Sequence, residues 1–221
     1  MKVGNKPIKS DLLLQKEEYW NVITHGVGII LSLIGLVFLI IVARDHKTSW
    51  GFVAAVVFGV SMVAVYLSST LYHLAKYKNS PRWKIFRTID HIAIFYLIAG
   101  TYTPFLILVL GDSNGKFILS LIWSIAVFGT LYKLILGARF PKFSLFLYVA
   151  MGWLIIFDIR EFNALTPSHI LTLLLTGGVS YSVGTYFYTR VKLPYNHVIW
   201  HVFVLGGSAF HFMAIWNLYC L

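Results

Sequence analysis

The sequence predicts an all-α integral membrane protein, a bundle of seven transmembrane helices with a cytoplasmic N-terminus and the C-terminus outside. Hydrophobic residues make up 58% of the 221 residues and charged residues only 12%, whereas a soluble domain carries about 25% charged residues. The apolar residues form seven near-continuous runs, which indicates helices because a membrane strand would alternate apolar and polar residues. Lysine and arginine gather in alternate connections, which indicates the direction of each span.

Each run approaches the roughly 20 apolar residues that a helix needs to cross the hydrocarbon core. The first run is too long for a signal peptide and ends without a small-residue cleavage site, so we expect it to be retained. The fifth run is the shortest. The predicted spans are Asn21–Ala43, Gly51–Ala75, Thr88–Leu110, Lys116–Gly137, Phe143–Ile159, His169–Thr189 and Asn196–Leu221.

The chain divides into residues 1–20, a predicted cytoplasmic segment, and residues 21–221, the predicted transmembrane domain. Within the first part, Ser10–Tyr19 mixes leucines with charged residues, as a short interfacial helix would. The single cysteine, Cys220, excludes an intramolecular disulfide and a thiolate metal site. The net charge of +10 does not indicate a nucleic-acid partner, because the basic residues lie in the connections between apolar runs and not along one face.

The direction of the bundle follows from the lysines and arginines of the loops, which tend to stay in the cytoplasm. Fourteen of them would lie on the side of the N-terminus and four on the other side. A change of one span would move every later loop to the opposite side and remove this asymmetry. The fourteen are Lys2, Lys6, Lys9, Lys16, Lys76, Lys78, Arg82, Lys84, Arg87, Lys133, Arg139, Lys142, Arg190 and Lys192, and the four are Arg44, Lys47, Lys116 and Arg160.

Four ionisable residues lie near the ends of spans, where burial in lipid costs at least about 2–3 kcal/mol each. His197 and His201 are four residues apart and therefore project from one face of the seventh span. Such a pair can bind a metal ion, or it can be solvated by lipid headgroups. His73 ends the second span and Asp90 begins the third, and the predicted topology places all four residues at similar depth on the cytoplasmic side.

Three imidazoles and a water are the ligands of an open catalytic zinc site. We therefore predict that His73, His197 and His201 bind a metal ion, with zinc preferred over iron, nickel or copper. Asp90 could bind the ion, hydrogen-bond its water or orient a histidine. The Ser69 hydroxyl could bond to the water or to a substrate carbonyl, or back to the carbonyl four residues earlier. The residues at the same depth of the first span, which could brace the site or only solvate the helix end, are Glu18, Asn21 and His25.

Two other histidines are expected to lie outside the metal site. His91 follows Asp90 by one residue and points about 100° away on a helix. His211 lies ten residues beyond His201, about 15 Å deeper, and is expected to be a buried hydrogen-bonding histidine.

At these residues the chain resembles the progestin and adipoQ receptor (PAQR) family, and within it the bacterial hemolysin III branch. The resemblance covers essentially the whole chain and implies seven helices with a zinc ion near the cytoplasmic face. It places His73, His197 and His201 at zinc-ligand positions, Asp90 at the position of an aspartate that contacts the water, and Ser69 at that of a neighbouring serine. The matching pieces are Glu17–Gly26, Ser69–His73, Asp90–His91 and the stretch from His197 to Phe212.

Two classes of function stay open. The first is a zinc-dependent hydrolase that acts on a lipid amide or ester, similar to ceramidases, and contributes to membrane lipid homeostasis, with Asp90 as general base. The second is a non-enzymatic sensor or structural membrane protein in which zinc joins the second and seventh spans. The branch name also implies a hemolysin or pore-type cytolytic protein, although uniformly apolar spans do not favour a secreted pore former. Membrane lipids, including a lipid-like substrate, are the predicted partners, and the cell membrane is the predicted location.

Overall fold

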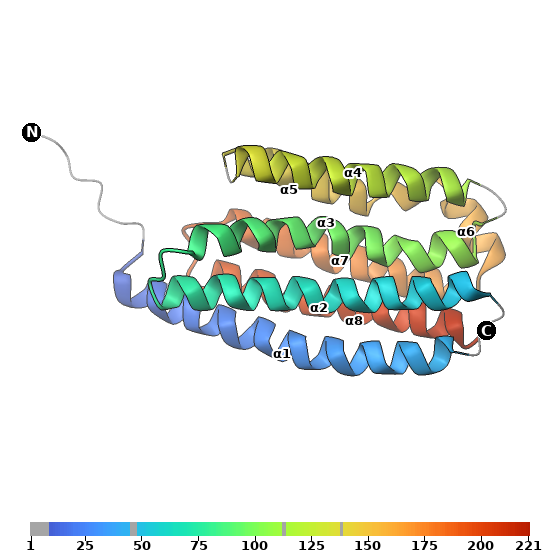
Figure 1. The fold of residues 1–221 in the computed structure, drawn as a ribbon, viewed down its shortest axis with the longest axis horizontal. Helices are drawn as coiled ribbons and strands as arrows, with labels where there is room; N and C mark the ends of the chain where they lie inside the picture. The colour runs from blue at the N-terminus through green and yellow to red at the C-terminus, as the bar shows by residue number, and fades with distance from the viewer. Residues whose placement is uncertain (1–8, 45–47, 112–113, 138) are drawn as a thin grey trace, which may run out of the picture.

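The computed structural model describes residues 9–44, 48–111, 114–137 and 139–221, and in these ranges it contains helices and no strands (Figure 1). Lys2, Lys6 and Lys47, which contribute to the predicted orientation, lie outside the described residues, as does most of the segment before Ser10. The elements are α1 (Asp11–Ala43), α2 (Ser49–Tyr77), α3 (Trp83–Leu108), α4 (Gly115–Leu136), α5 (Pro141–Gly152), a 3₁₀ turn (Leu154–Phe157), α6 (Ile159–Leu165), α7 (Ser168–Thr189) and α8 (Asn196–Tyr219).

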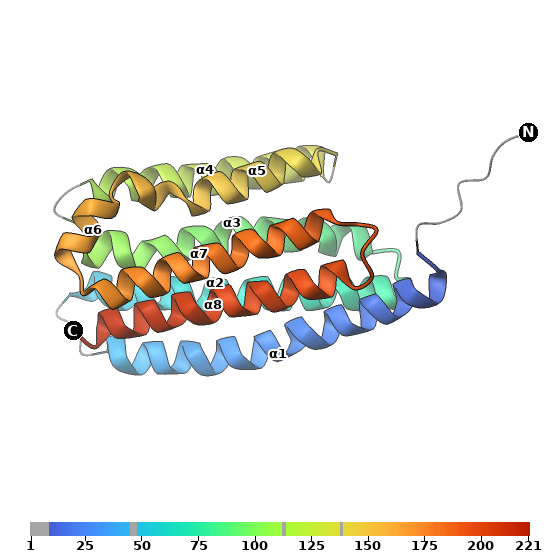
Figure 2. The same cartoon turned by 180° about the vertical axis from the view of Figure 1, so that it is seen from behind.

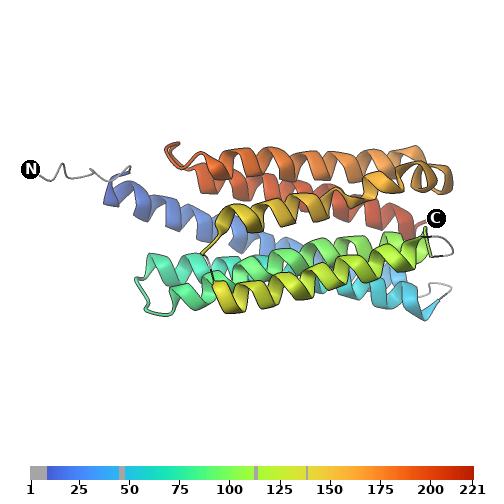
Figure 3. The same cartoon turned by 90° about the horizontal axis from the view of Figure 1, so that it is seen from above.

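The long helices run side by side and form a closed ring. Going round the ring, α1 packs on α2, α2 on α3, α3 on α4, α4 on α5, α5 on α7, α7 on α8, and α8 on α1. Seen from behind, α7 and α8 cover α3 and α2 (Figure 2); seen from above, α5 lies between the α7–α8 side and the side of α3 and α4 (Figure 3). Helix α3 also contacts α5 and α8 across the ring. The start of α1 and the end of α8 lie at opposite ends of the bundle, as an odd number of spans requires (Figure 1).

The predicted membrane class is confirmed. Among the described residues, six helices are long and apolar enough to cross a bilayer, and there are seven if the bent segment Pro141–Leu165 counts as one span. Large apolar side chains also cover the outside of the bundle: Ile135 is 78% exposed and Ile30 is 61% exposed. In water such a surface would be an aggregation site, whereas in lipid it is the solvated face. The protein is therefore a multi-pass membrane protein.

The fifth predicted span, Phe143–Ile159, is not one straight helix. Helix α5 ends at Gly152, a 3₁₀ turn follows, and α6 leaves at an angle of 58°. The break frees backbone groups, and Tyr102 of α3 takes up two of them. Its hydroxyl donates to the Gly152 carbonyl at 2.9 Å and accepts from the Ile155 N–H at 3.0 Å. A broken helix can lie at membrane depth only where protein groups replace the lost backbone hydrogen bonds, and the sequence pattern carries no sign of this distant partner.

Helix α1 begins ten residues before the predicted start of its span. The stretch Ser10–Tyr19, expected to be a short helix of its own, is continuous with the first span, and the Ser10 side chain caps it by accepting from the Leu13 N–H at 3.3 Å. No proline or glycine separates the two parts, so the helix has no reason to stop. This extension places Glu17 and Glu18 inside the bundle, where both are buried.

Close approach between helices depends on glycine at several positions, of which Gly28 and Gly129 are two examples. A Cβ atom on Gly28 of α1 would lie 2.4 Å from the Tyr66 ring of α2, and one on Gly129 of α4 would lie 2.4 Å from the Phe95 ring of α3. Neither distance is compatible with a side chain, so these glycines allow the helices to pack at their observed separation.

Candidate metal centre

The start of α1, the end of α2, the start of α3 and the start of α8 meet at one end of the bundle, on the left of Figure 1. This arrangement brings together His73 of α2 with His197 and His201 of α8. Each of the three offers a ring nitrogen, and these nitrogens lie within 4.8 Å of one another. His73 and His201 are each 1% exposed, and His197 is half-buried. The three predicted ligands, 124 or more residues apart between α2 and α8, thus form one cluster that could hold a metal ion.

Glu18 of α1 fixes the orientation of His73. Its Oε2 lies 2.7 Å from His73 Nδ1, and its Oε1 accepts from Lys76 Nζ at 2.5 Å. A carboxylate cannot donate, so His73 donates through Nδ1–H and carries its free lone pair on Nε2. That nitrogen is buried and has no hydrogen-bond partner among the described residues. The carboxylate–histidine pair is the usual way in which proteins orient a metal-binding imidazole.

Thr24 of α1 fixes His201 in the same way. The Thr24 hydroxyl donates to helix carbonyls, that of Trp20 at 2.9 Å and that of Asn21 at 3.1 Å. Its oxygen is therefore the acceptor for His201 Nδ1, which lies 3.1 Å away. This again leaves Nε2 with the lone pair. Sequence reasoning did not single out Thr24, although it lies three residues after Asn21 and four residues before Gly28, both of which are buried.

The other predicted supporting residues of α1 lie beside the cluster. The His25 ring stacks on the His201 ring at a centroid distance of 3.4 Å, and both His25 nitrogens are buried without a hydrogen-bond partner in the part of the chain that is described. Asn21 is buried as well. Its backbone carbonyl accepts from the Thr24 hydroxyl, and its side-chain oxygen makes no hydrogen bond with the described residues.

Asp90 and Ser69 line a cavity of about 60 Å³ together with His25, His197 and His201. Asp90 and Ser69 are both buried. The hydroxyl that bonds back to the Val65 carbonyl is that of Ser68.

The cavity wall also contains two residues that the sequence placed elsewhere. Lys133, counted above as a loop residue, is 1% exposed on α4, and its Nζ lies 3.3 Å from His91 Nδ1. Both residues line the cavity. His91 does not belong to the cluster of three histidines. Lys133 was missed because one charged residue at the end of an apolar run resembles a loop lysine.

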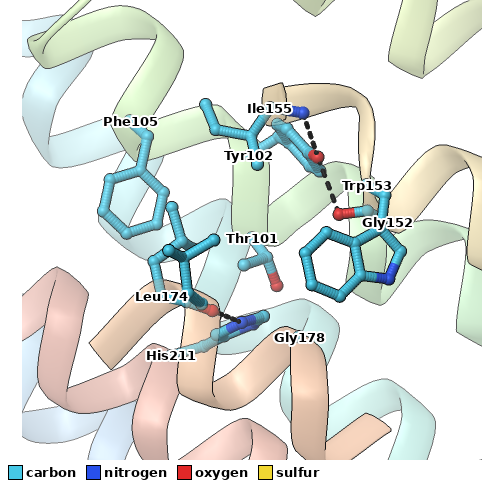
Figure 4. A pocket seen from close by; sticks show the side chains of 10 residues that line it. Thr101, Tyr102, Phe105, Gly152, Trp153, Ile155, Leu174, Gly178 and His211 are labelled. Carbon is cyan, nitrogen blue, oxygen red and sulfur yellow. Dashed lines mark hydrogen bonds between the residues drawn. The ribbon is translucent and has the colours of Figure 1, made fainter. Parts of the chain in front are cut away.

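Two further cavities continue from the first towards the other end of the bundle. A cavity of about 100 Å³ shares Val65, Ile94, Tyr148, Trp200 and Val204 with it, and has an almost entirely apolar lining. The innermost cavity, of about 30 Å³, is shown in Figure 4. There His211 hydrogen-bonds through Nε2 to the Leu174 carbonyl at 3.0 Å, as predicted for this deep histidine.

The residues present fit a metal ion. A buried imidazole nitrogen without a partner costs free energy, and the structure leaves His73 Nε2 in that state while bonding its Nδ1 to a carboxylate. The cluster supplies three histidine nitrogens from the described residues. That donor set suits zinc and other borderline transition metals and does not suit magnesium or calcium, which prefer oxygen.

The fold and the site define a class of protein: a multi-pass helical membrane protein with a buried cluster of three histidines that could hold a metal ion, at the end of the bundle where α2 ends and α8 begins. Comparison with known families agrees. The family described as "Haemolysin-III related" matches residues 14–212, and the chain belongs to this family. The resemblance to the hemolysin III branch of the PAQR proteins is confirmed.

Known relatives span nearly the whole chain. The "Hemolysin-3 homolog" of Bacillus subtilis (strain 168) is 46% identical over 206 residues, which cover 93% of this chain and 95% of the relative. The "Hemolysin-3" of Bacillus cereus is 48% identical over 200 residues, 90% of each chain. The human "Monocyte to macrophage differentiation factor" is 28% identical over 204 residues, 89% of this chain and 82% of the relative.

Proposed function

We propose that this protein is a zinc-dependent hydrolase that cleaves an amide or ester bond of a membrane lipid. The observation that carries the proposal is the cluster of His73, His197 and His201, two members of which, His197 and His201, line one cavity with the buried carboxylate of Asp90. Three protein nitrogens leave a coordination position open, as catalytic zinc sites do. When bound, zinc would supply a water that is nucleophilic at neutral pH and would polarise the carbonyl of the substrate.

The residues of the chain have separate tasks in this reaction. A carboxylate oxygen of Asp90 would accept the proton of the attacking water as general base. Ser69, which lines the same cavity, would orient that carboxylate or donate a hydrogen bond to the substrate carbonyl. Glu18 and Thr24 would keep the Nε2 atoms of His73 and His201 directed at the ion.

A lipid substrate is supported by the apolar cavity that continues from the site into the bundle. The two cavities measure about 60 and 100 Å³, which is smaller than the roughly 300–1,000 Å³ of typical ligand pockets. An acyl chain therefore requires neighbouring helices to separate. Helix α5 lines both cavities and is the helix with the broken backbone, so it is the element that we expect to move.

The names of the two Bacillus relatives suggest a cytolytic activity for those proteins. For this chain, hydrolysis of membrane lipids would disturb a host membrane without a pore. A structural zinc that only joins α2 and α8 remains the alternative to catalysis, and the two differ in their dependence on Asp90.

The test combines metal content with activity. Purified protein should contain about one zinc per chain, lost in His73→Ala, His197→Ala and His201→Ala and retained in His169→Ala, an exposed histidine at the other end of the bundle. Zinc-loaded protein should release fatty acid from a long-chain ceramide or a diacylglycerol in detergent micelles.

Asp90→Asn separates the two roles of the metal. Under the proposed function it retains zinc and loses hydrolysis. Zinc retention with no hydrolysis of either lipid by the wild type would favour a structural metal, and absence of zinc from the wild type would refute the metal site itself.

A further inference from the structure

A second buried ion pair is formed by the residue that precedes Glu18 on α1. Lys9 Nζ donates to Glu17 Oε1 at 2.6 Å, and both side chains are less than 10% exposed. Glu17 and Glu18 are neighbours in sequence, yet they bond to different helices. Glu18 bonds to His73 on α2, whereas Glu17 accepts from the backbone just before α8. The hydrolytic chemistry proposed above uses neither Lys9 nor Glu17, and an ion pair in so buried a position is expensive unless each charge has further partners.

These further partners belong to the connection from α7 to α8. Glu17 Oε1 also accepts from the backbone N–H of Tyr195 at 2.6 Å, and Lys9 Nζ also donates to Asn196 Oδ1 at 2.8 Å. The Asn196 amide in turn donates to the Tyr188 carbonyl, near the end of α7, at 3.2 Å. One network therefore connects the start of α1, the end of α7 and the start of α8.

The backbone at this point is held in an unfavourable conformation. Tyr195 has φ of 57°, in the left-handed region, and precedes the first residue of α8 without a side-chain cap of its own. A residue with a Cβ atom stays in that region only where its surroundings hold it there. The Glu17 carboxylate, supplied by another helix, takes the Tyr195 N–H and places a negative charge at the N-terminus of α8, where the helix dipole favours it.

The first of the two clustered histidines on α8, His197, follows Asn196 directly, and His201 follows one turn later. We propose that Lys9, Glu17 and Asn196 form a clasp that holds the start of α8 against α1 and thereby positions His197 and His201 to bind zinc together with His73. The inference rests on the proposed zinc site. The two adjacent glutamates then divide one task, because Glu18 orients the ligand of α2 and Glu17 sets the position of the ligands of α8.

The experiment measures zinc affinity by competition with a chelator of known affinity. Glu17→Met removes the acceptor of the Tyr195 N–H at similar side-chain size, and Lys9→Met removes the ammonium. Each should weaken zinc binding about tenfold, the lower end of the range for residues that position metal ligands. Glu17→Gln keeps an acceptor oxygen and should lose less than Glu17→Met. Two exposed residues of the same helix end, in Asp11→Asn and Lys16→Met, are the matched controls and should bind zinc as the wild type does.

The clasp has a second test that needs no variant at position 17. Coupling is reciprocal, so zinc should stabilise the clasp by the same factor by which the clasp favours zinc. Hydrogen exchange at the backbone amides of Tyr195, Asn196 and His197 should slow about tenfold when zinc is added to the wild type, and should not respond in His73→Ala. If Glu17→Met fails to fold, this measurement still tests whether the clasp is coupled to zinc binding.

The outcomes are distinct. If the wild type binds zinc and Glu17→Met binds it equally well, or if zinc leaves the exchange of these amides unchanged, the clasp is refuted and the proposed function stands. If the wild type binds no zinc, the proposed function fails and the clasp fails with it.

Discussion

Replacing Glu18 by glutamine should weaken zinc binding about tenfold without unfolding the protein. Glu18 holds His73 Nδ1 at 2.7 Å from a position inside the bundle. Glutamine has nearly the same size and can still accept the Nδ1–H through its amide oxygen, but it removes the negative charge that makes this hydrogen bond strong and the imidazole a better ligand.

The magnitude follows from the contacts of the two carboxylate oxygens. Loss of a residue that orients a metal-binding histidine costs about 10–100-fold in affinity, which corresponds to about 1.4–2.7 kcal/mol. Glu18→Gln preserves the geometry, so its loss of zinc affinity should lie at the lower limit of this range. The loss in Glu18→Ala should lie at the upper limit. The second oxygen bonds to Lys76, whose side chain is 42% exposed, and such a solvated pair contributes only about 0–1 kcal/mol.

Lys76→Met is therefore the control, and its zinc affinity should stay close to that of the wild type. The assay is chelator competition in detergent, with a thermal melt of each zinc-free variant to verify the fold. Wild-type affinity in Glu18→Gln would refute the orienting role of Glu18. An equal loss in Lys76→Met would show that the ion pair, and not the bond to His73, accounts for the effect.

Three further outcomes are expected from thermal unfolding in detergent. Tyr102→Phe should cost about 1–3 kcal/mol, because it leaves the backbone groups of the broken fifth span unsatisfied, whereas Tyr19→Phe, at an exposed ring, should cost little; equal melting temperatures would refute the bridging role. Gly129→Ala should cost about 1–3 kcal/mol through overpacking against Phe95, while Gly26→Ala, which has open space around it, should be neutral or slightly stabilising; the reverse order would show that the helices are spaced differently. Adding zinc at 100 times its Kd should stabilise the wild type by about 2.7 kcal/mol and should leave a variant lacking the three clustered histidines unchanged; equal stabilisation of both would place the ion elsewhere.

The sequence alone showed that the protein lies in a lipid bilayer, where its spans run and to which family it belongs. These follow from local properties: continuous apolar runs can be satisfied only in lipid, and a helix satisfies its own backbone wherever it lies. The predicted ends of most spans lie within a few residues of those observed, for instance Gly51–Ala75 against Ser49–Tyr77 for α2. The histidines were found by the same logic, because an ionisable residue in an apolar run is costly and therefore conspicuous.

Residues whose importance depends on a distant partner were not recognisable. Tyr102 resembles any aromatic residue of an apolar helix until the carbonyl of Gly152 is placed beside it. Lys133 was assigned to a loop because its burial depends on α3 and α5 closing over it. The break of the fifth span likewise depends on a partner helix that accepts its free backbone groups.

The difference between what the sequence determines and what the tertiary structure decides is clearest at the start of α1. From sequence, Glu17 and Glu18 are two polar residues before a membrane span, and Lys9 is one of fourteen basic residues that give the bundle its direction. Tertiary structure alone decided that Glu18 meets His73, 55 residues away, and that Lys9 meets Asn196, 187 residues away. Hydropathy and helical periodicity are properties of neighbouring residues and can be read along the chain, whereas these pairings exist only because the ring of helices closes and brings α8 back against α1.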